Sequence, residues 1–409
     1  MSVICLHLDP LQFFKRLSHE RHVCFLTGSG AEHWDTIIAF DPAEVFIANS
    51  RDVNGFLSFV ARSRALGRKL IGYLSYEVGC FLHQVSVQAV DDLQLPGIFF
   101  CAFDNYLVFH GSSARVYYND PEFPDRVAAI RRRAVKPLQQ GSQCFFIPEI
   151  SRRCYRAAFQ KIKTHIYKGD IYQVNLSHRL TARSTSSAPA LFISLCRKNP
   201  VGFLAFLDCG DFQVLSGSPE RFVTIQDGVI NTFPIKGTRP YAGKAKCQRE
   251  ELVRDFKEQA ELHMITDLLR NDVGKVCAPG SVRVVRSRVV RRCAAVWHAY
   301  SVVRGRLDYG IDSVQALLSM LPGGSISGCP KKRAIEIIDE LEPTARGIYT
   351  GVIGTINLHG NLDFNIAIRT IIKRGNKLWL QVGGGIVYAS QEEQEYQETL
   401  AKAASFQGL

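Results

Sequence analysis

The chain has 409 residues, of which 46% are hydrophobic and 22% charged, as in ordinary globular proteins with a large core. Its apolar runs are too short to span a bilayer, and the first residues lack a basic-then-apolar leader. We therefore expect a cytoplasmic protein with no membrane partner. The net charge of +12 at pH 7 is compatible with an anionic partner but does not identify one.

The chain has 12 cysteines but no Cys-x-x-Cys pair. Several lie inside apolar segments, which predicts buried reduced thiols and excludes a disulfide framework or a zinc site. No Gly-x-Cys-x-Gly turn is present, so we expect no cysteine amidotransferase site. Basic clusters at 131–133 and 286–292 leave nucleic-acid binding as a remote alternative. No recognition helix, zinc finger or ribonucleoprotein signature accompanies these clusters, so we expect no nucleic-acid partner.

Short apolar strands alternate with turns over the first 120 residues. They are predicted at residues 23–27, 36–40, 70–74 and 98–103. A helix is predicted over 121–143, and a polar junction at Gly141-Ser142 follows. The sequence therefore predicts an N-terminal domain at 1–143 and a catalytic domain at 144–409.

The second part mixes helices with strands. Ser151 is a predicted N-cap for a helix over 151–168. Further helices are expected at 255–273, 332–341 and 392–404, and strands at 353–357, 362–372 and 378–382. Strands grouped with separate helices indicate an α+β fold with mainly antiparallel sheet.

A lysine beside a flexible glycine, in Pro234-Ile235-Lys236-Gly237-Thr238, follows a β-like run. Such a lysine is a candidate nucleophile or charge anchor, and a solvated turn lysine is the alternative. Two pairs of carboxylates lie three residues apart on predicted helices. They are Glu258 with Glu261, and Glu395 with Glu398. Carboxylates from two helices suit Mg²⁺, although each pair alone also fits a solvated acidic face.

Other polar features have weaker signals. The run 267–274 is interpreted as a capping and salt-bridge cluster, with Gly274 as the residue after the helix. Glycine-rich turns at 322–328, 351 and 383–385 can expose amides to a carboxylate. Arg369, expected on a strand, could clamp a carboxylate with two hydrogen bonds.

Several motifs in order resemble the chorismate-utilising enzymes over roughly residues 150–406. They are Gly169 to Ser177, Ser218-Pro219-Glu220-Arg221-Phe222, Pro234 to Pro240, Asp267 to Gly274, Gly323 to Lys331, Gly347 to Gly351, Asn365 to Thr370 and Gly383 to Val387. The first third matches mainly at Gly72 to Glu77.

The resemblance implies two large, mainly antiparallel sheets packed face to face with helices outside, and a site in the C-terminal part that binds chorismate and Mg²⁺. Glu261 and Glu398 would bind the metal, supported by Glu258 and Glu395. Glu220 would act as general acid, with His298 near the leaving group. The substrate would contact Gln173, Ser325, Tyr349, Arg369, Gly384 and Gly385.

Two positions distinguish branches of this family. Water-adding relatives have a lysine base where this chain has Gln173, which favours ammonia as nucleophile. Relatives that make anthranilate have alanine at the position of Lys236. The lysine resembles the branch that makes 4-amino-4-deoxychorismate for 4-aminobenzoate and folate, with ammonia from a glutaminase subunit. Anthranilate formation remains the alternative. The segment 389–392 departs from the family pattern, because it lacks the usual proline.

Overall fold

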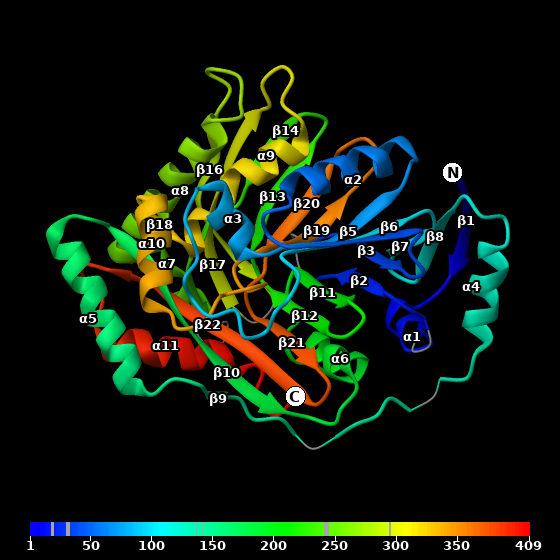
Figure 1. The fold of residues 1–409 in the computed structure, drawn as a ribbon, viewed down its shortest axis with the longest axis horizontal. Coiled ribbons are helices and arrows are strands. Elements are labelled where there is room, and N and C mark those ends of the chain that lie inside the picture. The colour runs from blue at the N-terminus through cyan, green and yellow to red at the C-terminus, as the bar shows by residue number, and fades with distance from the viewer. Residues whose placement is uncertain (18–19, 30–32, 136, 142, 241–244, 294–295) are drawn as a thin grey trace.

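Two antiparallel sheets packed face to face form the molecule, with helices on the outer faces (Figure 1). The structure, a computed structural model, describes residues 1–17, 20–29, 33–135, 137–141, 143–240, 245–293 and 296–409. This confirms the predicted α+β class with two large sheets. Within the described residues, no helix is both long enough and apolar enough to cross a membrane.

The first sheet has 12 strands among the described residues. In spatial order they are β1 (Ser2–His7), β8 (Ser113–Tyr118), β7 (Tyr106–His110), β3 (Thr36–Ala39), β2 (Cys24–Thr27), β11 (Phe203–Asp208), β12 (Gln213–Ser218), β21 (Thr370–Arg374), β22 (Lys377–Val387), β10 (Gln173–Arg183) and β18 (Gly328–Cys329), with β9 (Ile147–Pro148) beside β10.

The second sheet has 10 strands among the described residues. Their order is β15 (Ile235–Pro240), β17 (Val296–Arg306), β14 (Val229–Thr232), β13 (Arg221–Gln226), β20 (Leu362–Ile366), β19 (Val352–Ile356), β5 (Lys69–Leu74), β6 (Ile98–Phe103) and β4 (Glu44–Ala48), with β16 (Arg283–Cys293) beside β17.

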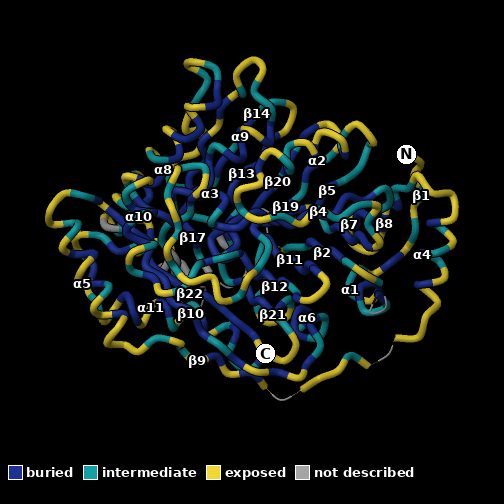
Figure 2. Tube along the Cα trace, viewed as in Figure 1, coloured by how far each residue is buried: buried dark blue, intermediate teal, exposed yellow. Residues whose placement is uncertain are grey.

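Helices cover both sheets from outside (Figure 1). They are α1 (Pro10–Phe14), α2 (Val53–Ala65), α3 (Tyr76–Leu82), α4 (Phe123–Arg132), α5 (Arg152–Lys168), α6 (Ala188–Lys198), α7 (Ala245–Arg254), α8 (Phe256–Gly274), α9 (Ser313–Met320), α10 (Lys331–Leu341) and α11 (Glu392–Ala404), with the 3₁₀ turn η1 (Gly324–Ile326). Buried residues follow the strands, and exposed residues gather on the helices and turns (Figure 2).

Both sheets contain strands from each side of residue 143. An apolar core between the sheets joins Leu26 and Ala205 of the first sheet to Tyr73 and Ile353 of the second. Among the residues described there, the chain around the predicted boundary has no helix or strand between α4 and β9. The division into two domains stays a prediction, and the two parts share both sheets.

Most predicted elements are present, and three expectations are wrong. The helix expected over 121–143 ends at Arg132, ahead of Pro137, which has no amide hydrogen to continue a helix. Gly274 is the last helical residue and not the residue beyond it, because the Lys275 amide still bonds to Asp272 and Val273. The single strand expected over 362–372 is two strands, β20 and β21, in different sheets.

Candidate active site

The strand break moves Arg369 from its expected place. It lies in the link between β20 and β21 with φ 50°, a backbone conformation rare for a residue with a side chain. Its carbonyl accepts the Gly217 amide at 2.8 Å, which fixes the link against β12. Burial lowers the pKa of Arg369, and the guanidinium also lowers the pKa of His298. The arginine therefore stands at the seam between the sheets beside His298.

Glu220 is a buried carboxyl group at the start of β13. The Ser325 hydroxyl donates to its Oε1 at 2.9 Å. Burial raises the pKa of Glu220 to about 7, while Ser325 and the charges of Lys236 and Lys402 oppose that rise. A carboxyl group near half-protonated at neutral pH can deliver a proton to a leaving group.

Lys236 projects from β15 toward α8, where its Nζ lies 3.3 Å from Glu261 Oε2. A Cβ added to Gly385 would lie 3.3 Å from the same Nζ and 3.1 Å from Gln173 Nε2. The lysine, Gln173 and the glycine of β22 therefore meet across the two sheets. The Arg239 side chain, which we also expected near Lys236, lies outside the described side chains.

Gly237 allows Glu258 to approach the backbone beside Lys236. Its φ is 85°, and a Cβ there would lie only 2.1 Å from Glu258 Oε2. Only glycine fits this conformation without displacing the carboxylate. His298 on the neighbouring strand β17 is buried and hydrogen-bonded to the Gly237 backbone, and burial lowers its pKa to about 4. His298 is therefore neutral at pH 7.

The last helix, α11, contributes the other carboxylates. Glu395 is buried and accepts the Ser390 hydroxyl at 2.6 Å, while its Oε2 would lie 3.4 Å from a Cβ on Gly384. Glu398 Oε1 lies 2.8 Å from Lys402 Nζ, which also donates to the Gly383 carbonyl at 2.8 Å. Lys402 thus joins Glu398 to the glycine strand.

Gln173 Oε1 is a buried polar atom that faces the same region without a hydrogen-bond partner in the described residues. Asn175, two residues away on the same face of β10, directs its side-chain amide toward the Tyr349 hydroxyl. Buried polar groups are normally hydrogen-bonded, so unpaired ones mark a place for a ligand. Tyr349 lies close by, since its hydroxyl would be 2.8 Å from a Cβ on Gly383.

Burial raises the pKa of Tyr349 to about 12, so it stays a neutral phenol. The structure thus brings all 13 predicted residues into one region through direct contacts or shared neighbours: Lys236, Glu220, His298, Gln173, Ser325, Tyr349, Arg369, Gly384, Gly385, Glu261, Glu398, Glu258 and Glu395. Sequence reasoning missed Asn175 and Lys402. Asn175 lies two residues after Gln173, so it shares a face of the strand, and Lys402 lies four residues after Glu398, so it shares a face of the helix. These spacings could have identified both residues.

The donor set fits magnesium. All four candidate ligands are carboxylates on two helices, and a bound cation would replace the ion pairs that Lys236 and Lys402 make with Glu261 and Glu398. Among the described residues, no three His, Cys, Asp or Glu side chains lie close enough to hold a metal ion. Mg²⁺ usually takes only one or two carboxylates and completes its shell with water and substrate oxygens.

The polar run 267–274 has the structural role expected of it. Asp272 is buried and pairs with Lys331 Nζ at 2.7 Å and with Lys275 Nζ at 3.0 Å. Asp267 pairs with Arg270 at the surface. These contacts join α8 to α10 and leave the run outside the site.

A buried acid of raised pKa and a lysine on strands, together with paired carboxylates on α8 and α11, make up the polar groups of an enzyme site. The chain belongs to the chorismate binding enzyme family, which it matches over residues 9–408.

The chain is similar to relatives that are named for two different products. The chain is 36% identical over 359 residues to aminodeoxychorismate synthase component 1 of Bacillus subtilis, covering 82% of this chain and 76% of that protein. It is 35% identical over 358 residues to anthranilate synthase component 1 of Neisseria meningitidis serogroup C, covering 82% and 73%. The solved anthranilate synthase component I of Streptococcus pneumoniae superposes with TM-score 0.83 at 29% identity, covering 93% of each chain.

Proposed function

We propose that the chain is the chorismate-converting component of aminodeoxychorismate synthase. It would convert chorismate and ammonia to 4-amino-4-deoxychorismate, the precursor of 4-aminobenzoate in folate synthesis. The observation that carries this proposal is Lys236, whose Nζ lies beside Gln173, Gly385 and Glu261. The similarity to aminodeoxychorismate synthase component 1 supports it.

The reaction divides into two displacements. The Lys236 amine, formed when its ammonium gives a proton to solvent, attacks C2 of the ring, the double bonds shift, and the C4–O bond breaks as Glu220 gives its proton to the departing hydroxyl, which leaves as water. Ammonia then bonds to C4, the double bonds shift back, and the C2–N bond breaks to return the lysine amine. The new C4 ammonium gives one proton back to Glu220.

The other residues bind and orient the substrate. Tyr349, Arg369 and the amides of Gly384 and Gly385 would hold its carboxylates, and neutral His298 would lie near the leaving group. Gln173 replaces a possible base and so disfavours attack by water. Glu261 and Glu398, supported by Glu258 and Glu395, would hold Mg²⁺. That ion would neutralise the ring carboxylate.

We also propose that ammonia comes from a separate glutaminase component. The chain has no Gly-x-Cys-x-Gly turn to hydrolyse glutamine itself. Folate-precursor synthesis places the protein in the cytoplasm under this proposal.

Anthranilate synthesis is the second candidate, because relatives of that name have similar identity. Product identity decides between the two. The purified chain is incubated with chorismate, Mg²⁺ and ammonium, and the product is identified by mass spectrometry and NMR. A 4-amino product that retains its enolpyruvyl group supports the proposal, and anthranilate contradicts it.

A further inference from the structure

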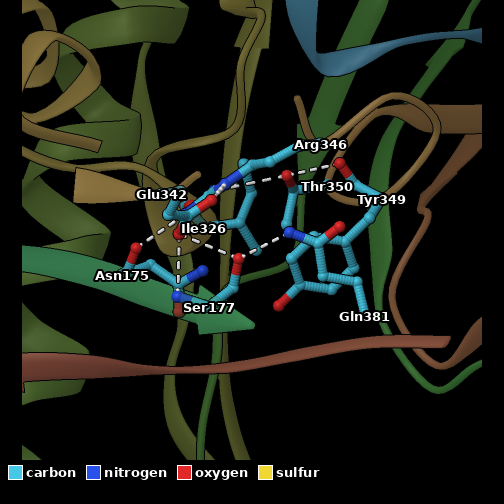
Figure 3. A network of polar contacts seen from close by, with 8 residues as sticks. All are labelled: Asn175, Ser177, Ile326, Glu342, Arg346, Tyr349, Thr350 and Gln381. Atoms are coloured by element: carbon cyan, nitrogen blue, oxygen red, sulfur yellow. Dashed lines mark hydrogen bonds and ion pairs between the residues drawn. The ribbon is translucent and has the colours of Figure 1, made fainter. Parts of the chain in front are cut away.

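Arg346 is a buried arginine whose five N–H groups all have acceptors (Figure 3). Its Nε and Nη2 form a two-point ion pair with Glu342, at 2.8 and 2.7 Å. Nη2 also donates to the Asn175 carbonyl at 2.7 Å. Nη1 donates to the Ile326 carbonyl at 2.9 Å and to Thr350 Oγ1 at 3.3 Å.

Each of these acceptors outside the ion pair lies beside a residue of the site. Asn175 is two residues from Gln173 on the same face of β10. Ile326 follows Ser325, which bonds to Glu220. Thr350 follows Tyr349, and its hydroxyl donates to the Tyr349 carbonyl at 2.5 Å. One guanidinium therefore fixes three chain segments that are far apart in sequence.

Glu342 extends the contact to the glycine strand. Its Oε1 accepts the Ser177 amide at 2.7 Å and the Ser177 hydroxyl at 2.8 Å. Gln381 of β22 donates to the same hydroxyl at 2.9 Å. Figure 3 shows these side chains converging on the ion pair. The strand that carries Gly384 and Gly385 is thereby joined to the same unit.

Thr350 holds a strained conformation at this point. Its φ is 61°, which a β-branched residue rarely adopts and which the surrounding contacts must maintain. The Thr350 amide bonds to Ala367 at 2.9 Å, two residues before Arg369. The strain and its restraint lie between Tyr349 and the link that carries Arg369.

A buried ion pair is a weak source of stability, since apolar residues of similar volume often serve equally well. Its directional bonds, however, fix segments that an apolar cluster would leave free to shift. We propose that Arg346, held by Glu342, is a positioning residue. It fixes the segments of Tyr349, Ser325 and Gln173 so that these side chains are oriented to bind chorismate. This inference rests on the proposed function only for the roles of those three residues.

The test is a double-mutant cycle on chorismate affinity, measured by calorimetry with Mg²⁺ and without ammonium. Arg346→Lys keeps the charge but loses the planar fork and the bonds to the two carbonyls. We expect it to weaken chorismate binding by roughly 10- to 100-fold. If Arg346 acts through Tyr349, the two substitutions should not act independently. The loss of chorismate affinity caused by Tyr349→Phe should then be at least about threefold smaller in the Arg346→Lys background than in the parent.

Arg179→Lys is the matched control. Arg179 lies on β10, the strand that carries Gln173. It is buried and pairs with Asp92 and Glu149, which belong to no site segment. Its thermal midpoint should fall, as in Arg346→Lys, while chorismate affinity stays at the parent value. In the double variant, Arg179→Lys should leave the loss of chorismate affinity caused by Tyr349→Phe unchanged, as expected for independent residues.

Thr350→Val serves if Arg346→Lys does not fold, because it removes only the hydroxyl between Arg346 and the Tyr349 peptide. It should weaken binding and couple to Tyr349→Phe in the same way. Unchanged affinity in the folded variant, or independent effects in the cycle, would overturn the inference. Chorismate affinity does not depend on which amino product forms, so anthranilate from the parent chain would overturn the proposed function alone.

Discussion

The Ser325 hydroxyl donates to Glu220 across 2.9 Å and, of the groups around this acid, most strongly opposes the effect of burial on its pKa. Glu220 must be protonated to act as general acid. Its pKa is raised from 4.5 to about 7, so the acid form is present at pH below about 7 and is lost as pH rises through that value. By opposing the effect of burial, the hydroxyl lowers the pH at which activity declines.

Ser325→Ala should move the alkaline limb of the kcat–pH profile to higher pH. The hydroxyl stabilises the charged carboxylate, and its loss leaves burial opposed only by Lys236 and Lys402. Steady-state rates between pH 5 and 9 measure the shift. Glu220→Gln, which cannot donate an acidic proton, should be inactive throughout. A limb that does not move in Ser325→Ala would remove Glu220 as the titrating group.

Lys236→Ala should slow formation of the 4-amino product by on the order of a hundredfold or more, because the covalent nucleophile is lost. Ammonia could then attack C2 directly and give the 2-amino isomer or anthranilate. Product NMR measures the distribution, and mass spectrometry of the parent enzyme with a chorismate analogue should find an adduct on Lys236. Parent-like rates to the same product, without an adduct, would make the lysine structural.

Glu261→Ala and Glu398→Ala should each abolish turnover, since each removes an oxygen ligand from a site that neutralises the ring carboxylate. Titration of activity with Mg²⁺ measures the loss. Asp267→Ala on α8 and Glu393→Ala on α11 are the matched controls, because both carboxylates lie on the same helices but pair with Arg270 and Arg152, which belong to no site segment. The metal assignment is wrong if the first two variants keep normal activity at low Mg²⁺.

The isolated chain should use ammonium and not glutamine. It lacks the Gly-x-Cys-x-Gly turn of cysteine amidotransferases. Adding a separate glutaminase component should confer glutamine-dependent turnover, measured as product formed in buffer without ammonium. Glutamine use by the chain alone contradicts this expectation.

Gly237→Ala should cost more stability than Gly228→Ala. Both glycines have positive φ, at 85° and 76°, so both substitutions incur backbone strain of about 1–2 kcal/mol. At Gly228 a new Cβ meets nothing within 4 Å, whereas at Gly237 it meets Glu258 Oε2 at 2.1 Å. Urea unfolding should show the difference, and only Gly237→Ala should lose activity. Equal losses would contradict the close approach of Glu258.

The fold class and the starts of several helices could be predicted because they leave local signals in the sequence. Ser151 caps α5 as expected, with its side chain accepting the Cys154 amide. Carboxylates three residues apart on a helix share a face whatever the rest of the fold does. These features depend on neighbours in the chain.

Features that depend on tertiary contacts were not predictable in the same way. The break before Arg369 falls inside an apolar run that looks like one strand, and only the passage between sheets reveals it. The Glu342–Arg346 pair reads as an ordinary pair of surface charges four residues apart, yet both residues are buried. Pairing between distant segments decides both cases.

The crossing of the chain at residues 367–369 has a mechanical result. β20 and β21 belong to different sheets, and the short span between them carries Arg369. A slide of one sheet over the other would therefore move this guanidinium away from His298. A core substitution far from the site, such as Ile353→Ala between the sheets, would then weaken substrate binding even in a variant that remains folded.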